Sequence, residues 1–321
     1  MKAARQEQTH TPAVLRVQLP RRPAWLEALS ADLCAEPVPS GNRHSLEIAE
    51  APGFAILRAV VPAADLGDDA LRLGVREAYT RIGRLLRERA LFPWRFWNYV
   101  PEIRKPATLG ANRYQVFNAG RCEGYRDWFG EALPGRVPAA SAVGHTEPSL
   151  VIDLLAGRAP GVAVENPRQV PAYRYSQRWG SLPPCFSRAM ALPVPFPEQR
   201  ERCALVSGTS SVVGENSRHP HDVHAQIRET CANLATLSAV LSDGAMRDSG
   251  EAAESKAALS RFRELRLYVV RDCDVDAVAM AFTSRFPGLE RLEIAVADLC
   301  RDELLLEVEG VAALDAPALA R

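Results

Sequence analysis

Residues 203–241 read CALVSGTSSVVGENSRHPHDVHAQIRETCANLATLSAVL, and this stretch combines a strand pattern, a polar loop and a helix pattern. The apolar run at 203–207 predicts a short strand. Asp222 is suited to cap a helix, because its carboxylate can accept hydrogen bonds from the free N–H groups of the first turn. Apolar residues then follow the helical period at Val223, Ile227, Cys231, Leu234, Leu237 and Leu241. The stretch therefore predicts a strand followed by a long helix with one apolar face.

The rest of the second half alternates between the same two patterns. Strand patterns occur at 171–176, 186–192, 265–270, 290–297 and 304–308, and a helix pattern occurs at 275–286. The predicted order is therefore β-β-β-α-β-α-β-β. Short strands interleaved with two helices are typical of an α+β layer, in which helices cover one face of a sheet. We predict the α+β fold class.

The first half is predicted less completely. Residues 1–60 mix short apolar runs with Pro and Gly, which predicts extended or irregular structure with one strand at 54–57. A helix is predicted from Asp68, because apolar residues recur at helical spacing between Leu71 and Leu86. The segment ANRYQVFNAGR at 111–121 is interpreted as a strand and a turn. Pro and Gly crowd residues 134–171, which indicates a boundary between an N-terminal α+β domain at 1–150 and a second domain at 151–321.

Composition excludes several classes of function. The chain has 321 residues, and its 39 Lys and Arg balance its 39 Asp and Glu. This balance leaves no sequence-wide basic footprint for nucleic acid or for an anionic membrane. No apolar run approaches the length of about 18 residues that a spanning helix needs. The first 20 residues lack the apolar core of a signal peptide, so we expect a soluble, cytoplasmic protein.

The motifs for cofactors and metals are missing or incomplete. The turn SGTSSVVG at 207–214 lacks the lysine of a P-loop, and no GxGxxG or GxSxG motif is present. Seven cysteines form no CxxC pair, so reduced and mostly buried thiols are expected. His219, His221 and His224 do not have HExxH spacing, which favours a solvated loop at the start of a helix over a metal site. We expect neither a cofactor nor a metal.

Four separated blocks resemble one family. They are NRYQVFNAGR (112–121), ENPRQVPAYRYS (165–176), VSGTSSVVGENSRHPHDVHAQIRETCANL (206–234) and DLCRDELLLEVEG (298–310). Together and in this order they resemble the chorismatases, which cleave the enolpyruvyl ether of chorismate and release pyruvate and a six-membered-ring carboxylate. Some members form the aromatic product 3-hydroxybenzoate. The resemblance implies chorismate as the substrate. It also implies that no cofactor is needed, because the reaction is acid–base chemistry.

The second half also resembles the RidA (YjgF) fold. The recurring features of that fold are a tyrosine strand, an SG turn, an Asp-led helix with a Gln, and a final ExE strand. In this chain they correspond to Tyr175-Ser176, Ser207-Gly208, Asp222 with Gln226, and Glu307-Val308-Glu309. The resemblance implies a RidA/YjgF-like (chorismate mutase-like) C-terminal domain packed with a related α+β N-terminal domain. Small RidA proteins place a carboxylate-binding Arg where this chain has Leu292, with Arg291 adjacent. That departure favours a chorismatase over an enamine hydrolase.

Arginines within the matched blocks are candidates for binding the substrate. Chorismate carries two carboxylates, and planar Arg grips a carboxylate through two parallel hydrogen bonds. Arg113, Arg168 and Arg174 lie in matched blocks, and Arg188 lies between the second block and the third. We favour Arg113 and Arg174, because Tyr114, Tyr173 and Tyr175 beside them can add hydroxyl donors. The alternative is that these are surface residues of an Arg-rich chain.

Glu307 is the candidate general acid. Cleavage requires protonation of the terminal methylene carbon of the enol ether, so the acid must still hold its proton near neutral pH. Glu307 follows the apolar run 304–306, where desolvation would raise its pKa, and Glu309 shares its strand parity. The resemblance further implies a role for Cys300, since aromatic-forming members carry a cysteine just upstream of the catalytic Glu. It also places Ser210 and Ser211 in the turn that shapes this region.

Three functions stay open at this point. The first is a chorismatase that forms 3-hydroxybenzoate, with or without some 4-hydroxybenzoate. The second is a hydrolytic chorismatase that gives a dihydroxycyclohexadiene carboxylate. The third is a RidA-like protein that binds a small carboxylate without converting it. A monomer or weak oligomer is expected, because two related halves in one chain can replace contacts that small RidA proteins make between subunits.

Overall fold

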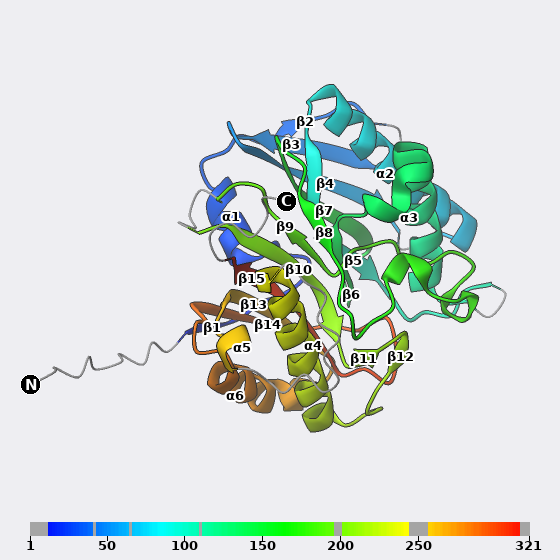
Figure 1. Cartoon of the computed structure of the whole chain (residues 1–321). Coiled ribbons are helices and arrows are strands. Elements are labelled where there is room, and N and C mark those ends of the chain that lie inside the picture. The colour runs from blue at the N-terminus through cyan, green and yellow to red at the C-terminus, as the bar shows by residue number, and fades with distance from the viewer. Residues whose placement is uncertain are drawn as a thin grey trace, which may run out of the picture.

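Two β-sheets face each other in this protein, and helices cover the outer face of each (Figure 1). The computed structural model describes residues 12–40, 43–63, 66–108, 111–195, 201–243 and 256–314. Residues 1–11, on which part of the N-terminal prediction rests, lie outside these ranges. One apolar core lies between the sheets, and one lies under the helices on each side.

The first sheet has six strands. Their order is β2 (Glu36–Pro37), β3 (Ser45–Glu50), β4 (Phe54–Pro62), β7 (Ser149–Gly157), β5 (Phe92–Pro101) and β6 (Ala139–His145). Only the β5–β6 pair is parallel. The helices α2 (Asp68–Glu88) and α3 (Arg113–Phe129) cover its outer face. The short helix α1 (Ala24–Ser30) places Leu26 in the core between the sheets.

The second sheet has seven strands. Their order is β1 (Ala13–Arg16), β14 (Arg291–Val296), β13 (Phe262–Val269), β15 (Leu306–Ala313), β10 (Cys203–Ser210), β9 (Ala189–Ala191) and β8 (Val162–Val164). The helices α4 (Val223–Asp243) and α6 (Val275–Arg285) cover its outer face, with α5 (Lys256–Leu259) beside α4. A hairpin of β11 (Val212–Val213) and β12 (Asn216–Ser217) follows β10. Four 3₁₀ turns lie at Gly130–Gly135, Ala172–Arg174, Gln177–Trp179 and Asp272–Asp274.

The two halves repeat one topology. The order β3-β4-α2-β5-α3-β6-β7 in the first half matches β9-β10-α4-β13-α6-β14-β15 in the second, apart from the β11–β12 hairpin and the short α5. The sheet orders β3-β4-β7-β5-β6 and β9-β10-β15-β13-β14 also correspond, and in each the third and fourth of these strands along the chain pair in parallel. The predicted α+β class is confirmed. The proposed domain limit at residue 150 falls inside β7, all of which pairs in the first sheet, whereas β1 pairs in the second.

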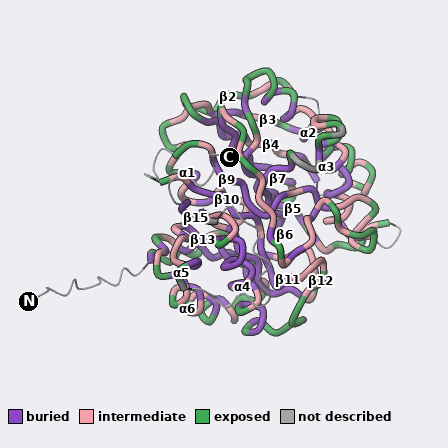
Figure 2. The backbone as a smooth tube through the Cα atoms, viewed as in Figure 1, coloured by how far each residue is buried: buried purple, intermediate pink, exposed green. Residues whose placement is uncertain are grey.

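Alternation along β5 explains why the sheets can pack on both faces. Trp97 and Tyr99 point into the core between the sheets, while Phe96 and Val100 point toward α2 and α3. Successive side chains of a strand point to opposite faces, so an apolar strand can contribute to two cores. Buried residues accordingly follow the strands, and exposed ones lie on the outer surfaces of the helices (Figure 2). This packing gives β5 buried positions on both faces.

The interpretation of residues 111–121 as a strand and a turn is wrong, because this segment begins helix α3. Asn112 and Gln115 form a reciprocal capping box, in which each side chain accepts a hydrogen bond from the other residue's backbone N–H. Gly120 lies where α2 passes closely: a Cβ there would lie 2.4 Å from the carbonyl oxygen of Arg72. This glycine, which suggested a turn, provides a close contact between two helices.

Most of the other predicted elements are confirmed, with three exceptions. The segment 171–176 contains the 3₁₀ turn Ala172–Arg174 rather than a strand, and in 186–192 only Ala189–Ala191 is a strand. The helix α1 lies in the region predicted to be extended or irregular. The Asp222 cap is present, since its Oδ1 accepts a hydrogen bond from the backbone N–H of Ala225 at 3.0 Å.

Candidate active site

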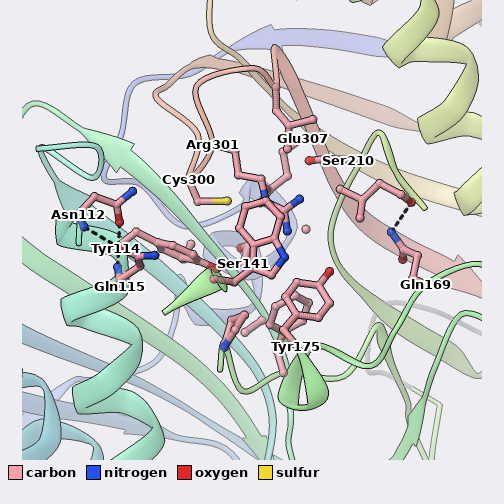
Figure 3. A pocket seen from close by; sticks show the side chains of 18 of the residues that line it. Asn112, Tyr114, Gln115, Ser141, Gln169, Tyr175, Ser210, Cys300, Arg301 and Glu307 are labelled. Carbon is pink, nitrogen blue, oxygen red and sulfur yellow. Dashed lines mark hydrogen bonds between the residues drawn. The ribbon is translucent and has the colours of Figure 1, made fainter. Parts of the chain in front are cut away.

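A cavity of about 260 Å³ lies where the two halves meet. Ser207 connects the halves here: its Oγ accepts a hydrogen bond from the N–H of Ala140 on β6 and donates one to the carbonyl oxygen of Ser187. On one side, α3 contributes Tyr114 (Figure 3) to the cavity wall. Arg121, also on α3, lines the cavity as well. The remaining walls come from β6, the segment 169–188, β10 and residues 300–307. The cavity therefore depends on both halves of the chain.

Glu307 on β15 supplies the buried carboxyl group of this cavity. It pairs across the strands with Ser210 on β10, and only 7% of its surface is exposed. Burial, followed by the negative charge of Glu309, raises the pKa of Glu307 to about 8. Arg95, Ser210 and Arg188 act in the opposite direction but do not outweigh these causes. Glu307 therefore holds a proton at neutral pH, as the sequence predicted for a general acid.

Gly208 makes room for this carboxyl group. A Cβ built on Gly208 would lie 2.1 Å from Oε1 of Glu307, which is far inside van der Waals contact. The second residue of the Ser207-Gly208 turn is thus required by the position of the acid. Glycine allows the backbone of β10 to approach the side chain that faces it from β15.

Two further neutral groups lie near Glu307. Burial, with a smaller contribution from Glu307, raises the pKa of Cys300 to about 12, so its thiol remains protonated. Burial also raises the pKa of Tyr114, with smaller contributions from Cys300 and Glu307, so its phenol remains protonated. All three side chains line the cavity. The chain thus places a carboxyl, a thiol and a phenol, each carrying its proton, in one site.

Two buried arginines face the same cavity. Nη2 of Arg121 donates a hydrogen bond to Oδ1 of Asn118 at 2.8 Å, and Arg121 is 1% exposed. Nη2 of Arg188 donates to the carbonyl oxygen of Val170 at 2.9 Å and to the hydroxyl of Tyr175 at 2.8 Å. Within the described ranges, neither guanidinium is ion-paired with a carboxylate. Because a buried cation is costly without a counter-charge, this pair favours an anionic ligand.

Arg301 lies at another wall of the cavity, where neutral groups hold its guanidinium in place. Its guanidinium carbon lies 3.5 Å from the ring centroid of Trp179, which is a stacking contact. Its Nη1 donates to the carbonyl oxygen of Glu215 and to Oγ of Ser217, at 3.1 and 2.9 Å. Arg301 therefore anchors the segment that contains Trp179 against the β11–β12 hairpin.

The structure brings together five of the nine site residues predicted from the sequence. Glu307, Cys300, Tyr114, Tyr175 and Ser210 line the cavity. Arg113, Tyr173, Arg174 and Ser211 are not among its lining residues. The first group includes both predicted catalytic residues, and the second includes both arginines that were favoured as carboxylate clamps.

The two arginines that were favoured as clamps, Arg113 and Arg174, do not line the cavity. Arg113 donates to the carbonyl oxygen of Ala63 and lies 3.4 Å from Glu102, so its charge is already balanced. It is adjacent to Tyr114 on a helix, where neighbouring side chains diverge by about 100°. Arg174 is exposed, and its guanidinium lies over the ring of Tyr173 at 5.8 Å. Ser211 donates to the carbonyl oxygen of Arg218 at 2.9 Å and contributes to a loop contact instead.

Arg121 was not among the residues predicted from the sequence, and Arg188 was not one of the favoured clamps. Arg121 ends the block NRYQVFNAGR and is seven residues after Tyr114, which is two helical turns. Recognition of α3 as a helix would have placed both side chains on one face. Arg188 was one of the four arginines considered as clamps but lies outside the matched blocks, and nothing in its local sequence favours it over Arg174.

The remaining motifs give no further centre. His219 lies 3.4 Å from Glu229, and within the described residues no group of three or more His, Cys, Asp and Glu side chains is placed to hold a metal ion. No helix in the described part of the chain is long and apolar enough to span a membrane. Among the described residues, the cavity that Glu307 lines is therefore the candidate active site.

These features define an α+β protein with two related halves and one cavity that combines a protonated carboxyl with two buried arginines. Residues 33–156 match the family model for the N-terminal part of FkbO/Hyg5-like chorismatases. A 3-hydroxybenzoate synthase of Streptomyces hygroscopicus is 34% identical over 238 residues, which are 74% of this chain and 68% of that protein. The chain belongs to the chorismatase family.

One solved structure agrees with this assignment. A chorismatase crystal structure superposes with a TM-score of 0.71 and 26% identity, covering 87% of this chain and 80% of that one. A member of the YjgF/YER057c/UK114 family from Mycobacterium tuberculosis aligns with 45% of this chain and 98% of its own, with a TM-score of 0.29 and 18% identity. The chorismatase match extends over both halves and therefore supports the fold of the whole described chain.

Proposed function

We propose that this protein cleaves the enolpyruvyl ether of chorismate to pyruvate and 3-hydroxybenzoate. The observation that carries the proposal is the protonated carboxyl of Glu307, buried in a cavity that two arginines without carboxylate partners also face. The named activity of the relative from Streptomyces hygroscopicus supports the same reaction. The products balance the substrate, because chorismate contains all the atoms of one pyruvate and one 3-hydroxybenzoate.

Arg121 and Arg188 are proposed as the carboxylate clamps. Chorismate carries one carboxylate on its ring and one on its enolpyruvyl side chain, and each requires a desolvated cation. Arg121 comes from the first half of the chain and Arg188 from the second. Two clamps on different halves would fix the orientation of the ring relative to Glu307. They replace Arg113 and Arg174 in this role.

Glu307 is proposed to donate its proton to the methylene carbon of the enol ether. The resulting oxocarbenium ion makes the side chain an activated leaving group. The ring 4-hydroxyl can then attack C3 and expel pyruvate, while its proton passes to the Glu307 carboxylate. The arene-oxide-like intermediate then aromatises to 3-hydroxybenzoate. A pKa of about 8 suits Glu307 to this step, since the acid is mostly protonated at pH 7.

The neutral thiol of Cys300 is proposed to guide the reaction toward the aromatic product. It lines the cavity beside Glu307, and its raised pKa keeps it a weak donor rather than a nucleophilic thiolate. In this position it occupies space that a water molecule would otherwise take. Exclusion of that water disfavours hydrolysis of the oxocarbenium ion.

Cys300→Ala is expected to shift the products from 3-hydroxybenzoate toward the non-aromatic diene diol while pyruvate release continues. The smaller side chain admits water to the activated ether carbon. Chromatography of the reaction mixture measures the two products directly. Cys203→Ala is the matched control, because it removes a thiol that is buried in the core outside the cavity. An unchanged 3-hydroxybenzoate fraction in Cys300→Ala would make Cys300 a packing residue.

Gly208→Ala is expected to slow pyruvate release by on the order of tenfold, because the new methyl group displaces the carboxyl of Glu307 from its reactive position. The measurement is the initial rate in an assay coupled to lactate dehydrogenase. Gly53→Ala is a suitable control, since a Cβ there would meet nothing within 4 Å. A wild-type rate in Gly208→Ala would show that the acid tolerates displacement.

Incubation of the purified protein with chorismate tests the proposed function. Release of pyruvate with an aromatic ultraviolet spectrum supports the proposal, and the chromatographic retention time identifies 3-hydroxybenzoate. Pyruvate together with a diene spectrum would instead indicate the hydrolytic reaction. Binding of chorismate without release of pyruvate would indicate a small-carboxylate binding protein.

A further inference from the structure

Glu309 lies one side-chain position beyond Glu307 on the same face of β15, and its carboxylate is enclosed by three donors. Nη2 of Arg95 donates to Oε2 at 2.7 Å, Nε1 of Trp97 to Oε1 at 2.8 Å, and Oγ of Ser141 to Oε2 at 2.6 Å. All three partners come from the first half, whereas Glu309 belongs to the second. Acceptance from three donors, one of them a guanidinium, is the pattern of an ionised carboxylate.

Glu309 is close enough to Glu307 to act on it electrostatically, although Glu309 itself does not reach a ligand in the cavity. Residues two apart on a strand face the same side at a spacing of about 6.6 Å, twice the rise per residue. Glu309 is 2% exposed and does not line the cavity that Glu307 lines. At this separation, charges interact more strongly in a buried setting than in water. Its charge therefore disfavours a second negative charge at Glu307.

We propose that Glu309 is a positioning residue that keeps the general acid Glu307 protonated, with Arg95, Trp97 and Ser141 holding its charge in place. This inference rests on the proposed function for the role of Glu307 as an acid. The arrangement joins the halves: donors on β5 and β6 fix an anion on β15, and that anion sets the protonation state of the neighbouring cavity residue.

Other charged groups around the pair do not replace Glu309. Arg95 and Arg188 face Glu307 and lower its pKa, while Cys300 and Tyr114 at the cavity are neutral. Glu309 also interacts electrostatically with Tyr99, Tyr268 and the ion pair of Arg266 with Glu293, whose Nε–Oε2 distance is 2.9 Å. Among the causes that act on Glu307, the charge of Glu309 is second only to burial in raising the pKa.

The test is a direct titration of Glu307 in Glu309→Gln. Protein labelled with ¹³C at the glutamate carboxyl is titrated by NMR without substrate, and Glu307→Gln identifies the signal of Glu307. Removal of the neighbouring anion stabilises the ionised form of Glu307. We therefore expect its titration midpoint to fall by about one pH unit or more in Glu309→Gln. An unchanged midpoint in the folded variant would overturn the proposal.

Two more variants separate charge from packing. Glu309→Gln leaves Arg95 buried without its carboxylate partner, so the Arg95→Met/Glu309→Gln double variant removes both charges and decides the outcome if the single variant does not fold. Its midpoint is also expected below that of the wild type, because Glu309 outweighs Arg95. Trp97→Phe keeps both charges and removes one donor, so its midpoint should stay at the wild-type value. A fall in Trp97→Phe equal to that in Glu309→Gln would assign the effect to packing.

The activity of the same variants gives a second readout. The basic limb of the kcat/KM profile for pyruvate release reports the ionisation of the acid in the free enzyme. In Glu309→Gln this limb should move to lower pH by the same amount as the titration midpoint. If the wild type releases no pyruvate from chorismate, the proposed function fails, and the titration without substrate still decides the role of Glu309.

Discussion

Replacement of Glu307 with Gln is expected to lower the rate of pyruvate release from chorismate by about 10²–10⁴-fold, the usual contribution of a positioned general acid. Gln has nearly the same shape as Glu but has no proton to transfer to carbon. The cavity, the two arginines and the neutral thiol all remain, so binding of substrate should change much less than kcat. The measurement is the coupled pyruvate assay over a range of chorismate concentrations.

The stability of Glu307→Gln supplies its own control. Because the pKa of Glu307 is raised from 4.5 to about 8, the folded state binds this proton more tightly than the unfolded chain. The stabilisation is complete below the unfolded pKa and is lost as the pH rises through about 8. Gln at this position has no ionisation that depends on pH. The Tm of Glu307→Gln should therefore rise relative to that of the wild type as the pH increases from 5 to 8. Activity within a few-fold of wild type in the folded variant would assign the acid role to another group.

The sequence predicted those parts of the fold in which local pattern and tertiary structure agree. Helix α4 begins after Asp222, and its apolar positions recur at the helical period, so both its start and its buried face could be predicted. Helix α3 could not, because Gly120 resembles a turn residue in isolation. The reason for a glycine at position 120 becomes clear only from the backbone of α2, which passes so closely that a side chain there would collide with it.

This one error about α3 also affected the prediction of the site. On a strand and turn, Arg113 beside Tyr114 is a reasonable clamp. On a helix, Arg113 turns toward Glu102, and the residue two turns after Tyr114, Arg121, faces the cavity instead. The choice between Arg174 and Arg188 depended on contacts that are distant in sequence, since Arg188 is held by Tyr175 and Val170. Glu307, Cys300 and Ser210 were predicted because matched family blocks contained them.

The proposed clamps, Arg121 and Arg188, lead to the second large effect. Arg121→Gln and Arg188→Gln should each weaken binding of the transition state by about 2–5 kcal/mol, because each leaves one substrate carboxylate buried without a cation. The lower end of this range corresponds to a fall in kcat/KM for chorismate of about 30-fold. Glutamine keeps a hydrogen-bonding group and part of the side-chain length, so the change mainly removes the charge.

Two arginines outside the cavity provide matched controls for these variants. Arg113→Gln acts on the same helix as Arg121 and removes a buried cation that is already paired with Glu102, so it should lower stability and leave kcat/KM near wild type. Arg174→Gln acts on an exposed residue of the segment that also contains Tyr175 and should change neither.

Calorimetric titration with a non-reactive chorismate analogue separates binding from catalysis. Wild-type affinity in both Arg121→Gln and Arg188→Gln would mean that the substrate carboxylates lie elsewhere. A loss confined to one of them would assign one carboxylate to that arginine and leave the other to Arg301, which also lines the cavity and forms no ion pair within the described residues.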